Sequence, residues 1–160
     1  MKNKFYNTPT FMSMEDDYNE SKLIVFGAGF DGTTSNRPGT RFASSSMRPE
    51  FYGLETYSPI LDLDMDDYKI CDIGDLELSI GNTDKVLDEI YKGTKAIVDD
   101  GKVPFMIGGE HLVTLPSFKA VYEKYKDIYV LHFDAHTDLR DEYNNNKNSH
   151  ATVIKRIWDI

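Results

Sequence analysis

The chain has 160 residues, of which 40% are hydrophobic and 28% are charged, which is enough to build one domain with a hydrophobic core. Its 27 acidic residues outnumber its 18 basic residues, and the formal net charge is −9. This balance argues against a nucleic-acid surface, which needs clustered lysine and arginine, and it is compatible with a cationic substrate.

The cysteine content and the distribution of apolar residues predict where the protein is located. Cys71 is the only cysteine, so the chain can form no internal disulfide, which favours a reducing environment. The first residues lack the apolar stretch of a secretory signal, and no apolar run approaches the roughly 18 residues that a membrane span needs. We therefore expect a soluble cytoplasmic protein without a membrane partner.

The first half of the sequence predicts two main strands, with a loop, a short helix and a minor edge strand between them. Residues 1–21 are polar and irregular, which predicts a loosely held arm. The segments that follow are a buried strand at 23–27, a long Gly/Ser/Thr/Pro-rich loop at 31–42, a short helix at 44–54 that contains Pro49, a minor edge strand at 61–64 and a second strand at 68–73.

The second half alternates helices and strands. Apolar residues recur at helical spacing over 83–100, where Asn82 or Thr83 can cap the start and Gly101 suits the position after the end. Further elements are expected as a strand at 103–107, a helix at about 113–125, a strand at 128–133, a polar turn at 144–148 and a helix at 151–158. This alternation predicts an α/β fold with a mainly parallel sheet and right-handed crossovers.

Two of the predicted strands end in possible metal ligands. The strand at 103–107 leads into residues 108–111 (GGEH), and the strand at 128–133 leads into residues 134–138 (DAHTD). In extended backbone Asp134, His136 and Asp138 project to one side, and His111 can join them because the carboxyl ends of parallel strands share one edge. Carboxylate and imidazole together suit Mn, Fe, Ni or Zn better than Ca or Mg, and bridging carboxylates favour an ion pair about 3.5–4 Å apart.

Polar residues at strand ends are also common in loops, so each motif alone is weak; together, on successive strands, they favour the metal site. His132 is interpreted as a core histidine or one that supports a ligand. Glu110 is either a supporting carboxylate or an ordinary strand-end acid, and the sequence leaves this open. Arg37 and Arg41 could reach an active-site mouth or a neighbouring subunit, but they are expected to brace their loop.

Four segments together resemble the agmatinase branch of the ureohydrolase (arginase and agmatinase) family. They are residues 35–42 (SNRPGTRF), 108–111 (GGEH), 132–138 (HFDAHTD) and 149–152 (SHAT), in family order over about residues 23–160. The resemblance implies a three-layer α/β/α fold with a mainly parallel sheet. It also implies that His111, Asp134, His136 and Asp138 are manganese ligands and that His150 is the catalytic proton-shuttling histidine.

The chain departs from this family pattern in two ways. Many members have aspartate where Glu110 stands. The family also supplies two further aspartate ligands and a substrate-contacting glutamate from a later segment that residues 1–160 do not contain. We therefore interpret residues 1–160 as a single domain that is the N-terminal part of a ureohydrolase catalytic domain, incomplete at its C-terminal side, with a binuclear manganese site whose remaining ligands come from the missing segment.

The resemblance implies hydrolysis of a small cationic guanidinium substrate, and agmatine, which would yield urea and putrescine for polyamine biosynthesis, fits best. Arginine, guanidinobutyrate and formiminoglutamate remain alternatives. So do a polyamine deacetylase on the same architecture and an inactive fragment that lacks half of the metal site. The complete protein is expected to be a homo-oligomer, a trimer or a hexamer.

Overall fold

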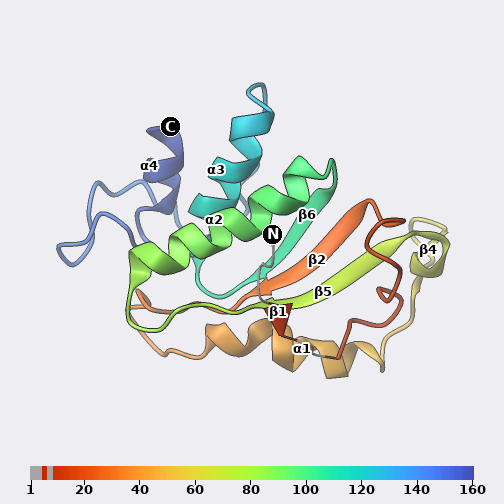
Figure 1. The fold of residues 1–160 in the computed structure, drawn as a ribbon. Helices are drawn as coiled ribbons and strands as arrows, with labels where there is room; N and C mark the ends of the chain where they lie inside the picture. Colours follow the sequence, from red (N-terminus) through yellow and green to blue (C-terminus); the bar gives the residue numbers. More distant parts are fainter. Residues whose placement is uncertain (1–4, 7–8) are drawn as a thin grey trace.

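A four-stranded sheet lies between helices in the computed structural model, which describes residues 5–6 and 9–160 (Figure 1). The strand order is β1-β5-β2-β6. Three of the strands are parallel, and β1 runs antiparallel to β5. Their bounds are β1 Phe5–Tyr6, β2 Leu23–Ala28, β5 Ile70–Leu76 and β6 Val103–Gly108.

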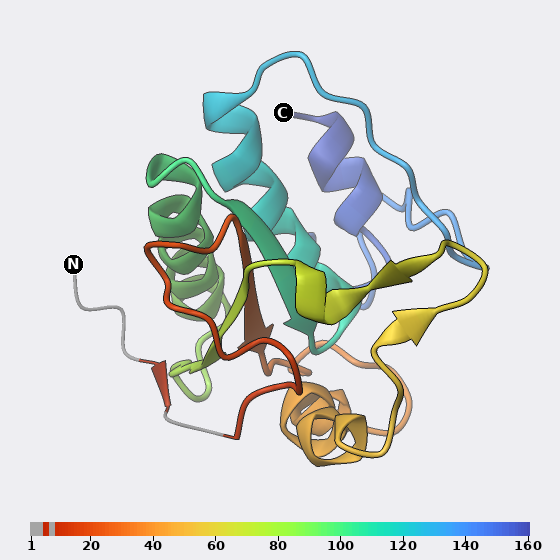
Figure 2. The ribbon, with the colours of Figure 1, turned by 90° about the vertical axis from the view of Figure 1, so that its right-hand side faces the viewer.

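Strand β2 supplies the two faces of the core because successive side chains point to opposite sides of the sheet. Ile24, Phe26 and Ala28 pack in one cluster with apolar residues of α2 (Thr83–Asp99). Val25 packs on the opposite face with Phe11, near α1 (Ala43–Phe51). Helix α1 thus covers one face, and α2 covers the other, where α3 (Thr114–Lys124) packs against it and α4 (Val153–Trp158) against α3 (Figures 1 and 2). These layers confirm the predicted α/β/α arrangement with a mainly parallel sheet.

The ends of α2 follow the predicted signals. The Asn82 side chain accepts a hydrogen bond from the Lys85 backbone N–H at 3.0 Å, and Gly101 has a positive φ of 76° just after the helix. The shorter elements are the β3–β4 hairpin (Tyr57–Ser58 with Leu63–Asp64) and the 3-10 helices η1 (Thr40–Phe42), η2 (Met65–Asp67) and η3 (His111–Val113). Among the described residues, no helix is both long and apolar enough to cross a membrane.

The prediction of a loosely held arm is wrong for residues 9–21. Phe11 is only 1% exposed, and its backbone N–H donates to the buried Asp72 carboxylate at 3.0 Å. Farther along, Asp16 accepts hydrogen bonds from Lys69 and from the Ile70 backbone. The buried Phe11 holds residues 9–21 against the core. The segment has no periodic apolar pattern that would reveal this from the sequence. The remainder of the predicted arm, residues 1–4 and 7–8, lies outside the described residues.

The strand predicted at 128–133 is also absent from the described sheet. Among the described residues this segment pairs with no strand, and Tyr129, Leu131 and Phe133 are 94%, 82% and 94% exposed. Figure 2 shows it leaving the end of α3 as open coil. An apolar run predicts burial, but a strand also needs a neighbour for its backbone N–H and C=O groups. Strand β6, the last strand of the described sheet, does not pair with this run.

Candidate functional site

The end of β6 is held tightly against the loop that follows β2. The backbone N–H of Gly109 donates to the Ala28 carbonyl at 3.2 Å, and that of Glu110 donates to the Phe30 carbonyl at 2.7 Å. A Cβ atom on Gly109 would lie 2.1 Å from the Phe30 carbonyl oxygen, so only glycine allows this approach. The chain then turns directly into η3, whose first residue is His111.

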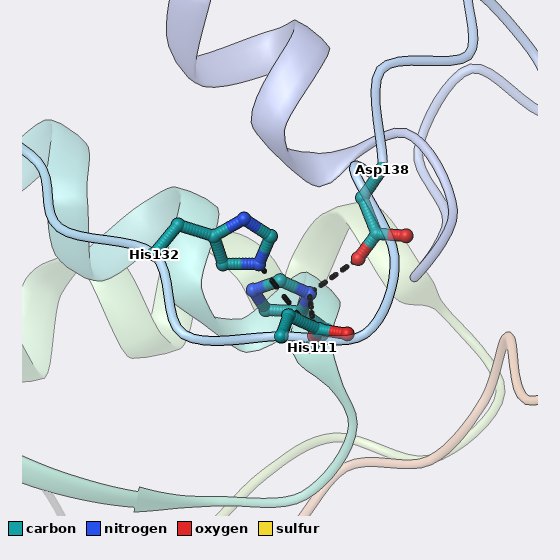
Figure 3. Close-up of side chains that lie close together, drawn as sticks. His111, His132 and Asp138 are labelled. Carbon is teal, nitrogen blue, oxygen red and sulfur yellow. Dashed lines mark hydrogen bonds and ion pairs between the residues drawn. The ribbon is translucent and has the colours of Figure 1, made fainter.

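His111 is the centre of a cluster of possible ligands. Its Nδ1 lies 2.6 Å from Oδ2 of Asp138 and 3.7 Å from Oδ2 of Asp134. His132 Nε2 lies 3.5 Å from the same Asp134 oxygen, and the His132 ring stacks on that of His111 at 5.2 Å between centroids (Figure 3). One ligand atom from each of these four residues lies within 4.8 Å of the others.

This cluster has the donor chemistry of a metal site and is slightly wider than the ligand sphere of one ion. Ligand atoms that each lie about 2.0–2.2 Å from one ion are at most about 4.4 Å apart. The observed spread of 4.8 Å needs only small side-chain movements to meet that limit. Mixed imidazole and carboxylate donors suit transition metals such as Mn, Fe, Ni or Zn.

Three of the four predicted ligands thus come together, and His136 does not join them. Its backbone N–H donates to Asp134 Oδ1 at 2.8 Å, and its side chain is 82% exposed. The predicted alternation fails here because the backbone bends after Asp134 and Asp138 adopts a positive φ of 48°. His132, which the sequence indicated as a core or ligand-supporting histidine, is the fourth member of the cluster instead.

A hollow of about 330 Å³ nevertheless brings all of the predicted site residues together. It lies between the loop after β2 and the two ligand segments. Its lining consists of Thr34, Ser35, Asn36, Arg37, Glu110, His111, Asp134, His136, Asp138 and His150. A second hollow of about 500 Å³ shares Ser35, His136, Asp138 and His150 with the first and extends toward Tyr143.

The loop after β2 reaches His150. The His150 Nδ1 lies 2.8 Å from the Thr33 carbonyl oxygen, and its Nε2 lies 3.3 Å from the Ser35 hydroxyl. The backbone N–H of His150 donates to Thr33 Oγ1 at 3.1 Å, and Tyr143 packs its ring edge-on against the imidazole. Ser35 belongs to a predicted motif, but no local sequence signal points to Thr33, which lies 117 positions before His150.

Asp31 braces this loop together with Arg41, as expected for Arg41. The Asp31 carboxylate accepts hydrogen bonds from the Gly39 N–H at 2.7 Å and from Arg41 Nε at 3.0 Å. Burial raises the pKa of Asp31, but the hydrogen bonds from Arg41 and Gly39 outweigh that effect and hold the pKa below its ordinary value. Arg37 lines the hollow, which matches the alternative position at the mouth of a site.

The electrostatics of the cluster favour ionised carboxylate. The hydrogen bond from the His136 backbone N–H, followed by the nearby His111 and His132 rings, lowers the pKa of Asp134 from its ordinary value. Asp134 therefore stays negative at neutral pH and is ready to hold a cation.

The chain matches a family model, and it is similar to several proteins of related sequence and structure. The arginase family model matches residues 21–160. Agmatinase from Bacillus subtilis is 43% identical over 155 residues, which cover 97% of this chain and 53% of the relative. The crystal structure of a candidate agmatinase from Clostridium difficile superposes on this chain with a TM-score of 0.88 and a sequence identity of 80%. The match covers 90% of this chain and 52% of that one. The agmatine ureohydrolase of Thermoplasma volcanium is 34% identical with a TM-score of 0.87, covering 96% and 51%. The chain spans about half the length of these relatives.

Proposed function

Because the chain belongs to the arginase family, we propose that it forms the N-terminal half of a metal-dependent catalytic domain that hydrolyses agmatine to putrescine and urea. The observation that carries this proposal is the single hollow around which His111, Asp134, His136, Asp138 and His150 all lie. The agmatinases among the similar proteins support the choice of substrate.

We assign the metal ligands to His111, Asp134, His136 and Asp138. His111, Asp134 and Asp138 already meet in one cluster, and His136 lines the same hollow with its Nδ1 3.5 Å from Asp134 Oδ1. A bound pair of manganese ions would polarise the substrate and lower the pKa of water. Two ions need more donors than these four, and the rest of the complete protein would supply them.

His150 is assigned the transfer of a proton to the leaving amine. A carbonyl oxygen can only accept a hydrogen bond, so the 2.8 Å contact with Thr33 places the proton of the neutral ring on Nδ1. The lone pair of Nε2 is then directed at the Ser35 hydroxyl on the wall of the hollow. Nε2 is thus the nitrogen that would take up a proton and release it to the amine.

The negative charge of the whole chain, formally −9, would raise the local concentration of the cationic guanidinium. The bound ions would neutralise Asp134 and Asp138, so this attraction would come from the other acidic residues. This attraction is common to all guanidinium substrates and does not by itself choose agmatine.

The first test is whether the natural protein, with any sequence its gene encodes beyond Ile160, releases urea from agmatine when loaded with Mn²⁺. We expect urea release that is abolished by a chelator, and no acetate release from an acetylated polyamine. Acetate without urea would indicate a deacetylase instead. His150→Ala should retain the bound metal and lose activity by about 10²–10⁴-fold, whereas unchanged turnover would remove His150 from the mechanism.

A further inference from the structure

Glu110 is a buried carboxylate that the proposed reaction does not use. It is 6% exposed, and both of its oxygens accept hydrogen bonds from one residue. Oε1 accepts from the Thr33 backbone N–H, and Oε2 accepts from the Thr33 hydroxyl, each at 2.6 Å. These two short contacts join the end of β6 to the loop after β2 across 77 positions of sequence.

Thr33, held by Glu110, in turn contacts His150. The Thr33 hydroxyl donates to Glu110 Oε2, so its proton points at that carboxylate. Its lone pairs are therefore free for the His150 backbone N–H, which donates to Oγ1 at 3.1 Å. The Thr33 carbonyl oxygen accepts a hydrogen bond from Nδ1 of the His150 ring at 2.8 Å. Thr33 thus fixes both the backbone and the ring of His150.

We propose that Glu110 and Thr33 are positioning residues that orient His150 and hold its proton on Nδ1, so that Nε2 faces the hollow. This inference rests on the proposed function of His150 as the residue that moves a proton. In a simpler alternative, the Glu110–Thr33 contact only ties two segments together. The two ideas differ in what they predict for activity. If the contact only ties the segments together, substituting Thr33 lowers activity by the same factor whether or not His150 is present.

The matched substitutions are Thr33→Val and Thr33→Ser. Valine has nearly the shape of threonine but lacks the hydroxyl that contacts both Glu110 and His150, whereas serine keeps that hydroxyl. Thr10→Val is an external control, because the Thr10 hydroxyl also donates to a glutamate, Glu15, at 3.2 Å on the exposed surface outside the hollow. In the Mn²⁺-loaded natural protein, we expect Thr33→Val to lower kcat for agmatine by about 10–100-fold with little change in KM, since a small misplacement of a catalytic group can cost about 10²-fold.

Thr33→Ser and Thr10→Val should stay within about threefold of the parent. The decisive comparison is a double-mutant cycle with His150→Ala. If Thr33 acts through His150, adding Thr33→Val to His150→Ala should cost almost nothing more. An equal loss in both backgrounds would overturn the proposal, and so would a serine variant as slow as the valine variant.

A second measurement separates this inference from the proposed function. The ¹⁵N shifts of the His150 ring in the metal-free natural protein, at a pH where the ring is neutral, report which nitrogen carries the proton. We expect protonated Nδ1 in the parent and a weaker preference for that tautomer in Thr33→Val, because valine keeps the carbonyl that accepts from Nδ1 but loses the hydroxyl that holds the His150 backbone beside it. Protonated Nε2 in the parent would refute the positioning role, whatever the substrate proves to be. Absence of urea release with protonated Nδ1 would instead count against the proposed function alone.

Discussion

Replacing Arg48 with methionine tests how α1 is attached to the sheet. The Arg48 side chain is fully buried, and its guanidinium donates to Asp72 at 2.7 and 3.0 Å and to Asp75 at 2.7 Å. Burial lowers the pKa of Arg48, but the hydrogen bonds to Asp72 and Asp75 outweigh it and raise the pKa, so the guanidinium stays charged. Methionine fills a similar volume and leaves the Asp72 carboxylate without its counter-charge.

The expected loss follows from what remains around Asp72. Removing one partner of a buried ion pair costs about 3–5 kcal/mol because the other charge stays buried. Asp72 keeps two backbone donors, the N–H groups of Phe11 and Gly74 at 3.0 and 2.9 Å. We therefore expect a loss near about 3 kcal/mol, a large part of a typical unfolding free energy of about 5–15 kcal/mol.

The assay is denaturant unfolding of the natural protein at neutral pH. Arg48→Lys should recover part of the loss, because lysine keeps the charge but cannot form the planar two-point contact with Asp72. Arg140→Met is the control for removing an exposed arginine; it loses the contact of the guanidinium with the Tyr143 ring and should change the unfolding free energy by less than about 1 kcal/mol. If Arg48→Met were as stable as the Arg140 control, the buried network would contribute nothing to holding α1, and the reasoning would be refuted.

Four further predictions concern the site. Asp31→Asn should lower the unfolding free energy by about 1–2 kcal/mol at pH 7. Because the folded pKa of Asp31 lies below its unfolded value, this loss should shrink as the pH falls below about 4. Denaturant unfolding of both proteins at pH 7 and at pH 3 measures the difference. Gly109→Ala should destabilise by about 1–3 kcal/mol or more, since its Cβ would collide with the Phe30 carbonyl, and an unchanged melting temperature would contradict this contact. Asp138→Asn should abolish tight Mn²⁺ binding in a calorimetric titration; affinity equal to the parent would remove Asp138 from the ligand set. Residues 1–160 produced alone should release no urea from agmatine, and ordinary turnover by that chain would show that the site needs no further segment.

Features that depend on local sequence were predicted well. The helix over 83–99, its cap at Asn82 and its end at Gly101 follow from apolar spacing and from single-residue conformational preferences. The strands β2, β5 and β6 match the predicted apolar runs to within about three residues, because each is short and bounded by polar or glycine residues.

Features that depend on distant partners were not predictable in the same way. The run at 128–133 has the composition of a buried strand but is unpaired in the described structure, since pairing depends on a neighbour. The exchange of His136 for His132 in the cluster follows from a bend that the alternation rule ignores. The contacts that link Thr33 to Glu110 and His150 span 77 and 117 positions, and nothing in the local sequence encodes them.

The most direct test of the central claim is the ratio of kcat/KM for agmatine to that for arginine, measured as urea release by the Mn²⁺-loaded natural protein. Agmatine lacks only the carboxylate of arginine, so the ratio isolates substrate choice from the chemistry of guanidinium hydrolysis. We predict a ratio well above one, with both activities lost on chelation. A ratio below one would assign the protein to arginine hydrolysis, and no urea from either substrate would contradict the proposed function.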